Sequence, residues 1–76
     1  MSRYSRKLMR QLKRIRQSIW ALKDFRNFSD VYQMLPREER ALIQRQVDQM
    51  EDIELTLTIR YSLANRREKD GTQKNK

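Results

Sequence analysis

The chain has no cysteine and no histidine, and its 76 residues include one glycine and one proline. Without cysteine there is no disulfide framework, and without cysteine or histidine the commonest zinc ligands are absent. The same two absences remove the usual general base and the most reactive nucleophile of enzymes. A single glycine does not make a glycine-rich phosphate loop. We therefore expect a protein that is not an enzyme and has no cofactor or metal.

Long hydrophobic runs are also missing. No stretch approaches the ~20 apolar residues of a membrane-spanning helix, and no uninterrupted apolar core of a secretory signal follows the basic N-terminal segment. These absences predict a cytoplasmic protein. The acid-poor, arginine-rich start also resembles a mitochondrial transit peptide, although the pattern continues without a cleavage-like break. The sequence leaves a nuclear or mitochondrial location open.

Apolar residues are few for a chain of this size, because 37% of the residues are hydrophobic and 37% are charged. Small domains bury a low fraction of their surface, and those without disulfides or metals often depend on a partner subunit. We therefore expect a homodimer or a component of a complex. By analogy, the size also fits a viral, plasmid or phage accessory protein.

Acidic residues are missing from the first 23 positions, which carry eight lysines and arginines and a local charge of +8. Residues 24–65 carry five basic and eight acidic groups, a net −3, and residues 66–76 carry five basic and two acidic groups, a net +3. This distribution indicates a polyanionic partner: nucleic acid, an anionic membrane or an acidic protein surface. The alternative is that the charges only keep the protein soluble.

Residues 3–23, RYSRKLMRQLKRIRQSIWALK, have the spacing of an amphipathic helix. Its expected core stripe repeats every three or four positions and comprises Tyr4, Leu8, Leu12, Ile15, Ile19 and Leu22. The opposite side carries the candidate residues for binding nucleic acid or an acidic partner: Arg3, Arg6, Lys7, Arg10, Lys13 and Arg14. Trp20 is predicted to cover an edge of the core. The alternative is that Trp20 and Met9 anchor a partner protein.

Glycine and proline positions predict two long antiparallel helices in an all-α helical hairpin. The first helix should span about 4–26, capped by Ser2 or Ser5 and ended by Asn27 in the left-handed conformation. The second should span about 37–67 after Pro36, the only proline. Its expected core residues keep helical spacing, with Ile53 on their flank, and are Ile43, Val47, Met50, Leu57, Tyr61 and Ala64.

The connecting elbow, residues 28–35, should be a short turn or helix whose apolar side chains fill the open end of the hairpin. These side chains are Phe28, Val31, Tyr32, Met34 and Leu35. Residues 1–64 are then a single helical domain. Residues 65–76 contain no apolar side chain and should form a basic, flexible tail.

Residues 53–63, IELTLTIRYSL, also fit a strand, because every second residue is apolar. A strand here would have to pair between chains, since the sequence offers no second one. We therefore predict a helix, on which Leu55, Ile59 and Leu63 form a second apolar stripe. A helix with two apolar sides needs two neighbours, so this stripe is the candidate interface of a helical-bundle dimer.

An acidic cluster, formed by Asp48, Glu51, Asp52 and Glu54, is the remaining candidate for chemistry. On a helix these carboxylates do not converge on one point. We expect them to be a solvated surface, partly paired with the basic first helix, and not a magnesium or acid–base site.

These patterns predict a small non-enzymatic regulatory protein that binds DNA or RNA through its basic helix, mainly by phosphate contacts. One alternative is an adaptor or inhibitor that docks the same helix on an acidic protein surface. A further alternative is peripheral binding to a membrane surface. The sequence does not distinguish DNA from RNA, and it shows no base-reading motif.

Overall fold

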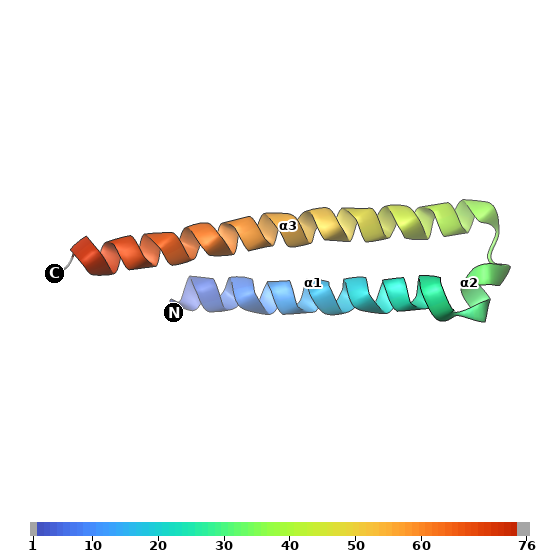
Figure 1. Ribbon diagram of the computed structural model, residues 1–76, viewed down its shortest axis with the longest axis horizontal. Coiled ribbons are helices and arrows are strands. Elements are labelled where there is room, and N and C mark those ends of the chain that lie inside the picture. The colour runs from blue at the N-terminus through green and yellow to red at the C-terminus, as the bar shows by residue number, and fades with distance from the viewer. Residues whose placement is uncertain (1, 75–76) are drawn as a thin grey trace.

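The computed structural model describes residues 2–74, with side chains for residues 2–68. It consists of α1 (Arg3–Phe28), α2 (Asp30–Met34) and α3 (Arg37–Lys74). In Figure 1, α1 and α3 run side by side in opposite directions and α2 connects them at one end. The molecule is a rod with Cα extents of 61 × 15 × 14 Å. The predicted all-α hairpin is confirmed, and residues 53–63 are helical.

Serines lie at both ends of α1. Ser2 Oγ accepts a hydrogen bond from Ser5 N–H at 3.1 Å and begins α1. Ser29 ends α1 and begins α2, since its N–H donates to the Phe25 carbonyl at 3.1 Å and its Oγ accepts from Val31 N–H at 3.1 Å. The prediction that Asn27 ends α1 is wrong. No non-glycine residue that the structure describes has a positive φ, and the extended Ser29 replaces the expected left-handed residue.

α3 begins directly after Pro36, whose carbonyl accepts from Arg40 N–H at 3.1 Å. Two glutamates, Glu38 and Glu39, lie in its first turn, where the helix dipole favours acids. α3 continues to Lys74, beyond its predicted end near residue 67, and so includes most of the predicted tail. The flexibility of that tail stays a prediction, and residues 75–76 lie outside the described residues.

The core is a narrow strip between α1 and α3, and it follows the predicted stripes except at Tyr4. The prediction that Tyr4 belongs to the core is wrong, because it is 43% exposed and its hydroxyl meets Arg60 at the surface. The buried hydrophobic residues of the core are Leu8, Leu12, Ile19, Val47, Leu57 and Ala64. Ile15 and Tyr61 pack against this strip and are half-buried. The side chain of Trp20 is 70% exposed, so the prediction that it covers an edge of the core is wrong. α1 packs chiefly on a single neighbour, α3, which covers only the centre of its apolar side.

The elbow fills the end of the hairpin less completely than predicted. Phe28, Val31 and Met34 are largely exposed, whereas Tyr32 and Leu35 are half-buried. The inward contact is made by Tyr32, whose ring meets that of Phe25 edge-to-face with 5.8 Å between centroids. The five residues of α2 form little more than one turn, so only one side of α2 can face α1.

A polar network that the sequence did not predict joins the start of α1 to the last part of α3. Ser5 is fully buried, and its Oγ donates to Glu68 Oε1 at 2.7 Å. The N–H of Ser2 donates to the same oxygen at 3.2 Å. Hydrogen bonds from Ser2 and Ser5 favour the charged carboxylate and hold the pKa of Glu68 below its ordinary value of 4.5.

This network predicts an acid-sensitive contribution to stability. Because the pKa of Glu68 is lowered in the folded chain, its contribution is present above pH 4.5 and is lost as pH falls through the folded-state value. Thermal unfolding of wild type and Glu68→Gln at several pH values measures this contribution. Wild type should have the higher midpoint at pH 7, and the difference should shrink below pH 4.5. A difference that grows on acidification would contradict the assignment.

Candidate nucleic-acid interface

The outer side of α1, opposite α3, carries a continuous row of cations. Lysine and arginine recur every three or four positions, so one helix face collects all of them. We call this set the basic face: Arg3, Arg6, Lys7, Arg10, Lys13 and Arg14. All six side chains are exposed, as the sequence predicts for the side opposite the core.

The dimensions of the basic face suit a nucleic acid backbone. Arg3 and Arg14 lie eleven helical steps apart, about 16 Å at 1.5 Å per residue. One strand of B-DNA presents a phosphate every 3.4 Å of axis, so this length spans about five phosphates. Arg3, Arg6, Lys7 and Arg10 together line a shallow surface pocket at the N-terminal end of the face. An arginine-rich pocket of this kind can donate several hydrogen bonds to a phosphate.

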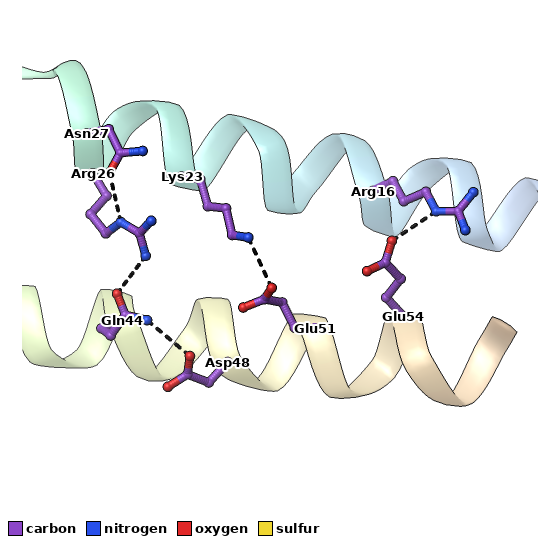
Figure 2. Close-up of polar contacts among 8 residues, drawn as sticks. All are labelled: Arg16, Lys23, Arg26, Asn27, Gln44, Asp48, Glu51 and Glu54. Carbon is purple, nitrogen blue, oxygen red and sulfur yellow. Dashed lines mark hydrogen bonds and ion pairs between the residues drawn. The ribbon is translucent and has the colours of Figure 1, made fainter. Parts of the chain in front are cut away.

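Other cations of α1 serve the hairpin itself. Arg16 Nε lies 2.9 Å from Glu54 Oε2, and Lys23 Nζ lies 3.0 Å from Glu51 Oε2. Figure 2 shows both side chains reaching from α1 to carboxylates of α3. Both pairs are solvent-exposed, and exposed pairs stabilise by at most about 1 kcal/mol each. They link the two helices but contribute little to stability.

A third cross-helix contact lies nearer the elbow. Arg26 Nη1 donates to Gln44 Oε1 at 2.7 Å, and Gln44 Nε2 donates to Asp48 Oδ1 at 3.0 Å (Figure 2). With Glu51 and Glu54 in ion pairs, the acidic cluster is a solvated and partly paired surface, as predicted. Among the residues whose side chains are described, no group of three or more acidic residues is arranged to hold a metal ion.

The basic face differs from these paired cations. Within the described part of the chain, none of its side chains makes an ion pair or a hydrogen bond. One reason lies in the sequence, because residues 1–23 contain no acid that could pair with these cations along α1. The positive charge of the basic face is therefore uncompensated by the described residues.

α3 adds cations beside this face that sequence reasoning did not assign to the site. Arg60 Nη2 donates to the Tyr4 hydroxyl at 2.9 Å, and the guanidinium carbon lies 5.9 Å from the centre of the Tyr4 ring. Arg67 lines a surface pocket together with Tyr4 and Ser2. The charge of residues 66–76 was the available signal for Arg67, and no such signal marked Arg60. Only the helix register shows that both arginines lie next to the start of α1.

The predicted partner anchors and the predicted oligomer interface are both accessible. Trp20 is 70% exposed, and Met9 is half-buried on the same flank of α1, eleven residues earlier in the helix. Leu55, Ile59 and Leu63 are 60%, 51% and 49% exposed on the side of α3 that faces away from α1. The structure thus separates the charged site on α1 from an apolar site on α3.

None of the described helices is both long and apolar enough to cross a membrane. Comparisons with protein-family models, with curated proteins and with solved structures find no match to this chain.

Proposed function

We propose that this chain is a small, non-enzymatic regulatory protein that binds nucleic acid through the basic face of α1. The observation that supports this most directly is the division of the α1 cations into two sets. Arg16 and Lys23 are ion-paired to α3, whereas the six cations of the basic face are exposed and make no ion pair with any described residue. Uncompensated cations in a row bind phosphates and release counterions.

The binding mode is contact with the sugar–phosphate backbone and not with base edges. The basic face consists of lysine and arginine only, so it offers cationic donors to phosphates, and among base edges it suits guanine alone and lacks the asparagine and glutamine that read adenine. Tyr4 is the one aromatic residue near it, and its ring is already covered by Arg60. Stacking of a base on Tyr4 requires displacement of that arginine. We therefore expect weak sequence preference and strong salt dependence.

Two arginines close together in the sequence provide a matched test. Arg14 belongs to the basic face, whereas Arg16 is ion-paired to Glu54. Arg14→Gln should weaken binding to a short DNA duplex about fivefold at 0.15 M salt and reduce the salt slope by about one. Arg16→Gln makes the same change in net charge and should alter affinity less than about twofold. Fluorescence anisotropy measures both, and an equal loss in the two variants would contradict the assignment to one face.

An adaptor or inhibitor that binds an acidic protein is the second candidate, and the exposure of Trp20 favours it specifically. Exposed tryptophans are enriched among residues that dominate protein interfaces. Trp20→Ala separates the two functions, because it removes an apolar anchor without changing any cation of the basic face. Unchanged affinity for DNA and RNA supports the nucleic-acid function. Specific capture of an acidic protein that survives high salt and fails with Trp20→Ala supports the adaptor.

Peripheral membrane binding is the least supported of the three functions. An interfacial helix needs its apolar side free to enter the headgroup region. In the hairpin, Leu8, Leu12 and Ile19 of α1 are buried against α3 instead. Membrane binding therefore requires the two helices to separate, and flotation with anionic vesicles tests it.

A further inference from the structure

The outer side of α3 carries an apolar row that the hairpin cannot cover. Leu55, Ile59 and Leu63 follow one another at intervals of four residues and are 49–60% exposed. α1 occupies the opposite side of α3, where Leu57 and Ala64 are buried. The row is therefore a second apolar side on a helix that has only one long neighbour. Such a helix is typical of the interior of a bundle.

Two charged residues flank this row with opposite signs and equal spacing. Asp52 stands seven residues before Ile59, and Arg66 stands seven residues after it. Seven residues are nearly two helical turns, so both charges lie on the same side of α3 as Ile59, each about 10 Å away. Both are exposed, and neither is in an ion pair with another residue that the structure describes. About the centre at Ile59, Leu55 and Leu63 are therefore symmetric, whereas Asp52 and Arg66 carry opposite charges at equal distances.

We propose that a second copy of this chain docks on this row, with the two α3 helices antiparallel and Ile59 at the two-fold axis. In this register Leu55 lies at the level of Leu63 of the second copy, and the two Ile59 side chains meet at the centre. Asp52 lies opposite Arg66 of the second copy, and the two-fold axis repeats that pair on the other side. A parallel arrangement instead brings each charge against its own like charge, which disfavours it.

The dimer places its two basic faces on opposite outer surfaces. Each basic face is turned away from α3, and each α3 is turned toward its counterpart, so the helices form a layer with the two α1 helices outermost. Packed helices lie 8–10 Å apart, and the two α1 axes are then about 24–30 Å apart. Given the proposed function, one dimer binds two nucleic acid segments at once and bridges them.

The first test measures mass in solution by sedimentation without nucleic acid. Wild type should have twice the chain mass at micromolar concentration, and Ile59→Asp should have the mass of one chain with unchanged helicity. Ile59 is exposed in the hairpin, so this substitution leaves the core between α1 and α3 intact. A single-chain mass for wild type, or an unchanged double mass for Ile59→Asp, would overturn the proposed interface.

The second test examines the register by charge reversal. Asp52→Arg and Arg66→Asp should each weaken dimerisation about fivefold to tenfold, and the double variant should recover the wild-type dissociation constant within about twofold. The single variants change the net charge in opposite directions. General repulsion between positive chains would therefore shift the two dissociation constants in opposite directions. That result would overturn the antiparallel register, and so would a double variant whose dissociation constant does not recover.

The third test examines bridging, with one set of duplexes carrying a donor dye and another an acceptor. Wild type should produce energy transfer between duplexes, and Ile59→Asp should bind duplexes without producing it. Binding by a wild-type dimer without energy transfer would overturn bridging and leave the proposed function intact. A wild type that binds no nucleic acid would overturn the proposed function and, with it, bridging, whereas the mass measurement would still decide the interface.

Discussion

Replacing both Arg6 and Arg10 by glutamate is expected to weaken binding to DNA or RNA by two to three orders of magnitude at 0.15 M salt. Each lost cation removes one phosphate contact and the counterion release that accompanies it, which lowers the affinity about fivefold at this salt concentration. Each new carboxylate lowers the affinity further, because the neighbouring phosphate repels it. Both side chains line the pocket at the N-terminal end of the basic face. Titration of a labelled duplex measures the loss.

The matched control is Arg37→Glu with Arg45→Glu. This pair makes the same change in net charge, from +8 to +4, on exposed positions of α3. We expect the affinity of this control to stay within a few-fold of wild type. Salt screens the attraction between distant charges, so the affinity depends mainly on cations that contact the nucleic acid directly. Helicity by circular dichroism should be unchanged in both variants, since none of the four side chains is buried. Equal losses in the two variants would mean that total charge, and not the basic face, determines binding.

Leu12→Ala is expected to destabilise the chain by about 3 kcal/mol. Leu12 is 2% exposed and packs in the cluster with Leu8, Leu57 and Ala64. Truncation of a buried leucine to alanine lowers the free energy of unfolding by about 2–5 kcal/mol. A small domain with one thin core has a total free energy of unfolding of only about 3–5 kcal/mol. Much of the protein should therefore be unfolded at 25 °C, which urea titration followed by circular dichroism detects.

Leu42→Ala is the matched control for the core substitution. Leu42 is 62% exposed on α3, and removal of its side chain should change the free energy of unfolding by less than about 0.5 kcal/mol. Similar effects of the two substitutions would mean that α1 and α3 do not pack as the hairpin shows. The comparison therefore tests the fold independently of any binding partner.

Apolar spacing predicts the centre of the core well and its edges poorly. Leu8, Leu12 and Val47 are buried as their spacing predicts, because three- and four-residue intervals place them on one helical stripe. Trp20 lies about 100° from that stripe, and periodicity does not reveal how wide a covering neighbour will be. In a two-helix layer the neighbour is narrow, so a position that a larger bundle would bury is left in solvent.

Contacts that depend on the register of the two helices were beyond sequence reasoning. Ser5 and Glu68 are 63 positions apart, and no local pattern indicates that their side chains meet. The same holds for Arg60 on Tyr4, which adds a cation beside the basic face. By contrast, the six cations of that face were predictable, because a single helix determines which residues share one side.

The salt dependence of nucleic acid binding tests the central claim most directly. Wild type should bind a short DNA duplex at 50 mM salt, and the logarithm of the association constant should fall linearly with the logarithm of salt concentration. If all six cations of the basic face contact phosphates, the slope should be about −5. No binding to DNA or RNA at low salt, or an affinity that does not change with salt, would contradict phosphate recognition by the basic face.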